Sequence, residues 1–219
     1  MGLLSLEQDE TLVWADFAVY ALLVLLCGAT VLLTMPEAPG WPAAAEVGAD
    51  GPIGTWRVLA DQTRVWLPLA WVLAGWWGWS LAEYLLHRFV LHGVPPFRRM
   101  HALHHARPLA HVATPTVVTV ALFGLLVALP AAWWLAPWQA SALMLGVLGA
   151  YLVYIATHHA VHHAHGTSSW LRRHKRWHAM HHLAGARACY GVSLPLWDHV
   201  FRTARARVRQ RTDMPAPRA

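Results

Sequence analysis

The sequence predicts an all-α integral membrane protein, and the clearest sign is the distribution of its apolar residues. Apolar side chains make up 57% of the 219 residues and charged side chains 13%, whereas a soluble domain carries roughly 25% charged residues. Four apolar stretches are long enough to cross the roughly 30 Å hydrocarbon core of a membrane as helices. They are residues 17–34, 65–86, 112–134 and 138–157. We therefore expect a bundle of about four transmembrane helices rather than an apolar soluble bundle.

The connections between these stretches are irregular or short. Residues 35–63 contain Pro36, Pro39 and Pro42 followed by small residues, a composition typical of an irregular loop. Pro137, with tryptophans on both sides, predicts a tight turn at the membrane interface between the third and fourth spans.

Basic residues gather on one side of the predicted bundle. The connection 93–111 and the segment 165–219 hold most of them, while the connection 35–63 offers only Arg57. Because cytoplasmic loops carry an excess of lysine and arginine, we place 93–111, 165–219 and the N-terminus in the cytoplasm. The net charge of +6 fits anionic lipid headgroups better than nucleic acid, since the arginines flank apolar spans and lack interleaved stacking aromatics.

Histidine is the most informative residue type, because most of the 16 histidines fall in four short clusters. These clusters supply ten candidate metal ligands: His87, His92, His101, His104, His105, His158, His162, His178, His181 and His182. Imidazole is the commonest metal ligand among protein side chains. Since a tetrahedral site uses only four ligands, the count predicts two metal ions, each held by about four or five imidazoles.

Helix geometry supports this interpretation for most of the clusters. Residues three or four apart lie on one face of a helix, so His158 and His162 share a face, as do the members of each H-x-x-H-H cluster. His87 and His92 are five apart, about 140° around an ideal helix. A helix end, a π-bulge or ligation of two different metals would each allow both side chains to point inward.

All four clusters should lie at one membrane depth. The first and third close the cytoplasmic ends of the second and fourth spans, and the other two lie just beyond them. The ten histidines can therefore meet in a helical cap at the inner membrane surface, with the open metal face toward the bilayer.

The metal is predicted from the chemistry of the ligands. Neutral nitrogen ligands suit iron, zinc, copper and nickel alike, and the H-E-x-x-H pattern of zinc hydrolases is absent from the sequence. Two redox-active irons at a membrane surface are suited to activating O2 against an unreactive C–H bond. We expect two iron ions with O2 as co-substrate, and zinc as the alternative occupant of purified protein.

Five motifs carry a resemblance to a known family. They are the E-Y-L-L-H-R-F-V-L-H sequence of residues 83–92, H-A-L-H-H at 101–105, H-H-A-V-H-H at 158–163, H-A-M-H-H at 178–182, and Y-G-V-S-L-P-L-W-D-H-V-F at 190–201. With these motifs the chain resembles the fatty acid hydroxylase/sterol desaturase superfamily of membrane di-iron enzymes, and its bacterial fatty acid hydroxylase-like members in particular.

The resemblance implies an oxidoreductase that hydroxylates a long-chain lipid, most simply a fatty acyl chain, with one oxygen atom from O2. Electrons would come from a separate donor, a ferredoxin or cytochrome b5-like protein with its reductase. The resemblance covers roughly residues 80–205, and the first span and the loop 35–63 lie outside it. We expect a catalytic region in 64–205, preceded by a transmembrane helix and irregular loop in 1–63 and followed by a basic, disordered tail in 206–219, all in one structural domain.

Other interpretations remain open at this stage. His159 and His163 are alternate ligands in the third cluster, and a His158/His163 pair would resemble the carotenoid hydroxylases. A carotenoid or sterol-type hydroxylase or desaturase of the same superfamily is the first alternative function. A hydrolase or isomerase using the same site is a second, and a non-catalytic metal-binding or metal-transport membrane protein is a third. A transporter normally places polar ligands near the bilayer midplane, where these spans are apolar.

Two carboxylates and three further histidines complete the candidates. Glu83 lies in an apolar span one turn before His87, where a carboxylate is costly unless it is paired. We expect Glu83 and Asp198 to orient ligand imidazoles without binding metal themselves. His111, His174 and His199 are expected to lie outside the ligand set.

Overall fold

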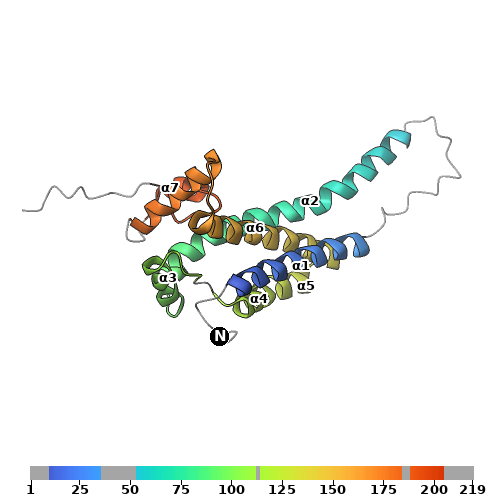
Figure 1. Cartoon of the computed structure of the whole chain (residues 1–219). Helices are drawn as coiled ribbons and strands as arrows, with labels where there is room; N and C mark the ends of the chain where they lie inside the picture. Colours follow the sequence, from blue (N-terminus) through green and yellow to red (C-terminus); the bar gives the residue numbers. More distant parts are fainter. Residues whose placement is uncertain (1–9, 36–52, 112–113, 184–187, 205–219) are drawn as a thin grey trace, which may run out of the picture. The chain divides into compact units, whose positions relative to one another are not determined.

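The computed structural model describes residues 10–35, 53–111, 114–183 and 188–204, and most of these are helical. In chain order the elements are α1 (Glu10–Thr34), α2 (Ile53–Leu85), η1 (Leu86–Leu91), α3 (Phe97–Ala106), α4 (Thr116–Phe123), η2 (Gly124–Ala128), α5 (Leu129–Trp134), α6 (Pro137–His163), α7 (Ser169–Leu183) and α8 (Leu196–Val200) (Figure 1). The described residues contain no β-strand, and the predicted all-α fold is confirmed.

Three helical segments of the described chain are long and apolar enough to cross a membrane. They are α1, the continuous segment Thr116–Trp134 formed by α4, η2 and α5, and α6. These segments match three of the predicted spans, and the protein is a membrane protein. The remaining predicted span, 65–86, lies in α2 and ends at the first residue of η1. A total of four spans and the cytoplasmic side of the metal site stay predictions.

The helix α2 begins earlier than predicted. The composition of 35–63 suggested an irregular loop, but the helix starts at Ile53. Residues 53–63 contain no proline. Pro52 stands directly before the first turn, where the fixed φ of proline is compatible with the start of a helix. Residues 36–52 of the predicted loop and the predicted tail 206–219 lie outside the described residues.

The chain divides into two compact units, one formed by Met1–Ser80 with His111–Val153 and the other by Leu81–Ala110 with Tyr154–Ala219. An aromatic cluster joins the helices of the first unit. Tyr20 of α1 packs edge-on against Tyr151 of α6 with ring centroids 4.6 Å apart. The ring centroid of Trp79 of α2 lies 5.1 Å from that of Tyr151 and 5.4 Å from that of Phe123 of α4. Figure 1 shows α1 beside α4, where the Tyr20 hydroxyl is hydrogen-bonded to the hydroxyl of Thr119.

Two glycines allow α2 and α6 to approach closely within the first unit. A Cβ atom on Gly146 would lie 2.0 Å from the carbonyl oxygen of Val72, and one on Gly75 would lie 2.1 Å from that of Leu143. Small residues at such crossings allow backbones to approach in membranes, where van der Waals contact drives helix association. The crossing therefore depends on the absence of a side chain at both positions.

The second unit is organised around Tyr84 near the end of α2. Its buried ring stacks on Phe201 with centroids 5.1 Å apart and meets Tyr190 edge-on at 5.9 Å. Its hydroxyl accepts a hydrogen bond of 2.7 Å from Nη1 of Arg88 and lies 3.0 Å from Oγ1 of Thr203. These contacts attach the segment 188–204 to the part of the chain that carries the first histidine cluster.

The glycine crossing gives a testable prediction. Gly146→Val should lower the free energy of unfolding by about 3 kcal/mol or more, because overpacking costs about 1–3 kcal/mol even where side chains can shift and here the obstacle is backbone. The measurement is the midpoint of thermal unfolding of the purified protein in detergent. Gly149→Val is the matched control, since the nearest neighbour of its Cβ is Cζ3 of Trp76 at 3.8 Å. Equal losses in the two variants would contradict the close approach.

Candidate metal centre

The second unit brings nine of the ten predicted ligands into two compact groups. Group one consists of His87, His92, His101, His105 and His181, and group two of His104, His162, His178 and His182. Within each group, the ring nitrogens available for ligation all lie within 4.8 Å of one another. Each group is therefore small enough to surround a single ion.

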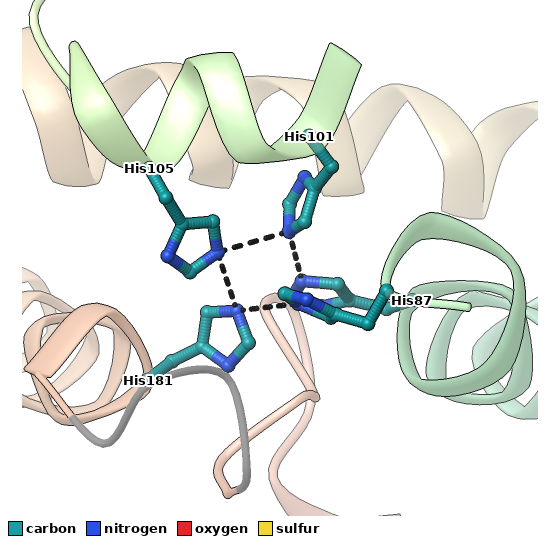
Figure 2. A group of neighbouring side chains, drawn as sticks. His87, His101, His105 and His181 are labelled. Carbon is teal, nitrogen blue, oxygen red and sulfur yellow. Dashed lines mark hydrogen bonds between the residues drawn. The ribbon is translucent and has the colours of Figure 1, made fainter. Parts of the chain in front are cut away.

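The distances in group one are those expected of neighbouring ligands around one metal. The Nε2 atom of His101 lies 3.0 Å from that of His87 and 3.1 Å from that of His105. The Nε2 atom of His181 lies 3.1 Å from those of His105 and His92. Figure 2 shows the imidazoles of His87, His101, His105 and His181 turned toward a common point. Ligands about 2.1 Å from a metal and at right angles to one another are separated by about 3.0 Å, so the donor set fits a transition-metal ion.

Group two has similar spacing. The Nε2 atom of His178 lies 2.8 Å from that of His162 and 3.1 Å from that of His182. His158, the tenth predicted ligand, is outside the group of four, but its Nε2 atom lies 3.2 Å from that of His104. Its ring centroid is 4.9 Å from those of both His162 and His178. The arrangement can supply four imidazoles, with His158 placed to complete the set.

A short π-helix explains how His87 and His92 reach the same group. η1 spans Leu86–Leu91, and His92 directly follows it. In a π-helix the hydrogen bonds run from residue i to residue i+5, so residues five apart lie nearly above one another. The two rings are accordingly stacked, with centroids 5.2 Å apart. Of the three solutions left open by the spacing, the structure has the π-turn.

Each H-x-x-H-H cluster is divided between the two groups. In α3, His101 and His105 are four residues apart and both turn to group one, whereas His104 turns to group two. In α7 the assignment is reversed, with His178 and His182 in group two and His181 in group one. The rings of His105 and His182 stack with centroids 4.2 Å apart, so the groups are direct neighbours.

The imidazoles are held in the neutral form that binds metal. Burial away from water, together with repulsion from neighbouring imidazoles, lowers the pKa of His104 to about 3 and that of His92 to about 4. Burial likewise lowers the pKa of His181 to about 3, against the opposing effect of its bond to a backbone carbonyl. Since desolvation penalises the charged form, the ring lone pairs are available for metal ions at neutral pH.

Backbone carbonyls of one loop orient two imidazoles of group one. Nδ1 of His87 lies 2.5 Å from the carbonyl oxygen of Tyr190, and Nδ1 of His181 lies 2.8 Å from that of Ala188. A carbonyl can only accept a hydrogen bond, so Nδ1 must carry the proton and Nε2 presents its lone pair to the site. Sequence reasoning missed these two residues, because it is their backbone atoms that act.

The two carboxylates support this loop rather than an imidazole. Asp198 is fully buried and accepts hydrogen bonds from the backbone N–H groups of Tyr190 at 2.9 Å and Gly191 at 2.7 Å. Glu83 accepts from the backbone N–H groups of Val192 at 2.8 Å and Ser193 at 2.9 Å, and from the Ser193 hydroxyl. The sequence predicted that both carboxylates orient ligand imidazoles, and in the structure their hydrogen bonds run to the backbone of residues 190–193.

The remaining histidines named from the sequence lie outside both groups. His159 and His163 stack on each other with centroids 4.7 Å apart, and neither belongs to group one or group two. His174 is buried, and its Nδ1 lies 3.0 Å from the carbonyl oxygen of Trp170. His199 is an exposed residue of α8, and His111 belongs to the first unit.

Known proteins resemble this chain in sequence. A dihydroceramide fatty acyl 2-hydroxylase of Arabidopsis thaliana is 32% identical over 147 residues, which are 60% of this chain and 59% of the relative. A fatty acid 2-hydroxylase of Rattus norvegicus is 34% identical over 142 residues, which are 57% of this chain and 37% of the relative. The chain thus matches less than two thirds of the length of each relative.

A solved structure resembles it in fold. Full-length scs7p, of which only the hydroxylase domain is visible, superimposes with a TM-score of 0.68 over 91% of this chain and 68% of that chain. The identity there is 21%, so this likeness concerns the fold alone. Residues 72–203, more than half of the chain and including every histidine of both groups, match the fatty acid hydroxylase family. The chain belongs to the fatty acid hydroxylase family.

Proposed function

We propose that this protein is a membrane oxidoreductase that hydroxylates the fatty acyl chain of a lipid at a binuclear iron centre, using O2. The observation that carries the proposal is the pair of all-imidazole groups with ring nitrogens about 3 Å apart, a spacing that matches ligation of a transition metal at about 2.1 Å. Membership in the fatty acid hydroxylase family supports lipid hydroxylation as the reaction at this centre. The names of the relatives support an acyl substrate, such as that of a ceramide.

In this proposal the two groups hold one ion each. The five imidazoles of group one would hold the first, and the four of group two, with His158, the second. Bound iron would supply the capacity to activate O2 toward an unreactive C–H bond. The protein residues keep the imidazoles neutral by burial, and at group one they fix the ring tautomers through the carbonyls of Tyr190 and Ala188.

Exposed apolar side chains near η1 support a lipid substrate. Leu85, Leu86 and Phe89 are all exposed although they flank the buried His87. In a membrane protein such side chains contact lipid rather than water. We propose that an acyl chain approaches laterally along these residues from the inner leaflet. Exclusion of water from this path would protect the oxidising chemistry from side reactions.

A separate donor would supply the electrons. The arginines of α3 and α7 are exposed, among them Arg98, Arg99, Arg172, Arg173 and Arg176. Basic surfaces raise the rate of encounter with acidic partners. We propose a ferredoxin or a cytochrome b5-like protein, with its reductase, docking on the cytoplasmic side.

Metal content tests the binuclear centre. Protein purified gently and saturated with Fe²⁺ or Zn²⁺ should hold about two ions per chain, because each group can supply at least the four ligands of a closed site. Inductively coupled plasma mass spectrometry of the protein in detergent gives the ratio. His199→Ala changes an exposed residue and should keep this value. Saturation at a single ion would overturn the binuclear centre.

The third cluster provides a test of the ligand register. His162→Ala should abolish hydroxylation, because the Nε2 atom of His162 lies 2.8 Å from that of His178 within group two. His163→Ala, its neighbour in the chain, should keep substantial activity, because His163 is outside both groups. Product formation by the two variants, normalised to folded protein, makes the comparison. The reverse result would move the register to His158/His163 and favour a carotenoid-type hydroxylase.

The oxygen source tests the reaction class. Turnover should require O2, a reductant and an added donor protein, and the product hydroxyl should carry label from ¹⁸O₂. Lipid mass spectrometry, with H₂¹⁸O in a parallel incubation, distinguishes the two sources. Label arriving from water, or turnover without O2, would mean that the centre performs hydrolytic or isomerising chemistry.

A further inference from the structure

The two histidine groups differ in how their imidazoles are held. From this difference we infer that the ion bound by group one is retained more tightly than the ion bound by group two, and that Asp198 and Glu83 are positioning residues for group one. The inference rests on the proposed binuclear centre. It adds an order of metal retention that the ligand set alone does not give.

Group one has an outer layer of hydrogen bonds. His87 and His181 each direct Nδ1 to a backbone carbonyl, that of Tyr190 and that of Ala188. Both rings are almost fully buried, with exposed fractions of 3% and 0%. A hydrogen bond on the far nitrogen fixes the orientation of the ring and raises the basicity of the ligating nitrogen. Group one therefore keeps two of its ligands in place before an ion binds.

The carbonyl of Tyr190 is fixed by a buried carboxyl group, because the N–H of its own peptide unit, that of Gly191, is bound by Asp198. The peptide unit of Ala188 is held less directly, since its N–H, that of Cys189, donates to the carbonyl of Thr203, whose hydroxyl donates to Asp198. Asp198 accepts hydrogen bonds from the N–H groups of Tyr190 and Gly191 and, at 2.7 Å, from the hydroxyl of Thr203. Glu83 accepts hydrogen bonds from the next two N–H groups, those of Val192 and Ser193. Four consecutive N–H groups, those of residues 190–193, are thus bound by two buried carboxyl groups. The loop cannot shift the Tyr190 carbonyl without breaking these bonds.

Group two lacks this outer layer. Nδ1 of His178 is buried and has no hydrogen-bond partner. Among the hydrogen bonds of the described residues, those of His104, His158, His162 and His182 join Nε2 atoms only to other imidazoles. Among the described residues, no hydrogen bond from outside the group therefore fixes which nitrogen of these rings carries the proton. Part of the ordering of these rings then falls to the ion itself, and that cost weakens binding.

The size of the effect follows from the role of such partners in known sites. Loss of the hydrogen bond to the far nitrogen of a ligating histidine typically costs about 10–100-fold in metal affinity. Group one has two such bonds and group two none among the described residues. We therefore expect the two ions to leave with rates that differ by about tenfold or more.

Chelation of the loaded protein tests this order. Full-length protein saturated with Zn²⁺ in detergent is mixed with excess chelator, and the metal left on the protein is measured over time by mass spectrometry. We expect a fast phase and a slow phase, each of about one ion per chain. Two ions leaving in one phase would overturn the inference but not the binuclear centre. A starting value of a single ion would contradict the binuclear centre instead.

A matched pair of ligand variants assigns the phases. His105 and His182 are both half-buried, both end an H-x-x-H-H cluster, and stack on each other. His105→Ala should remove the slow phase, and His182→Ala should remove the fast phase. The opposite assignment would overturn the inference. This comparison does not depend on any change to the loop.

Asp198→Asn tests the positioning role. The variant should accelerate the slow phase by about tenfold or more and leave the rate of the fast phase unchanged, because only group one receives the loop carbonyls. His199→Asn changes the next, exposed residue and should alter neither phase. Equal acceleration of both phases would mean that Asp198 supports the fold in general. If Asp198→Asn does not fold, Ser193→Ala provides the measurement, since it removes only the hydroxyl bond to Glu83 and should accelerate the slow phase to a smaller extent.

Discussion

The gathering of nine buried or half-buried imidazoles around two common points, with His158 beside the second, is the interaction on which the second unit depends. The buried side chains of α3 are His101 and His104, and three of the four in α7 are histidines. These helices therefore contribute few of the apolar side chains that normally form a core. Nitrogen lone pairs about 3 Å apart repel one another unless a proton or a cation lies between them. Because metal binding relieves this repulsion, the stability of the unit should be linked to metal occupancy.

The sequence was sufficient to predict the elements that depend on composition and spacing. Long uncharged stretches predicted α1, α6 and the segment Thr116–Trp134, since a membrane span must be apolar over its whole length. The histidine spacing predicted ten ligands that the structure gathers in one unit. The division of His104 from His105 could not be predicted, because sharing a face on one helix does not reveal which helix lies opposite. The π-turn at η1 was only one of three open solutions, since no residue type encodes it.

Sequence reasoning also missed the role of backbone atoms around the site. Glu83 and Asp198 attracted notice because a buried carboxylate is costly without partners, and this reasoning identified the right residues. It could not identify their hydrogen-bond partners, because the N–H groups of residues 190–193 are present whatever the side chains are. The Y-G-V-S pattern at 190–193 gave a family resemblance without a mechanism. The structure supplies the mechanism, with Gly191 so close to Asp198 that a Cβ atom there would lie 3.0 Å from its Oδ2.

The division of each H-x-x-H-H cluster between the two groups has a consequence for the spacing of the ions. His104 and His105 are joined by a single peptide unit and turn to different groups, and the same holds for His181 and His182. In the proposed binuclear centre the separation of the two ions would thus be constrained by covalent geometry in α3 and again in α7. A one-residue insertion in either cluster would disrupt both coordination spheres at once, so neither ion can be lost or repositioned by such a change without the other.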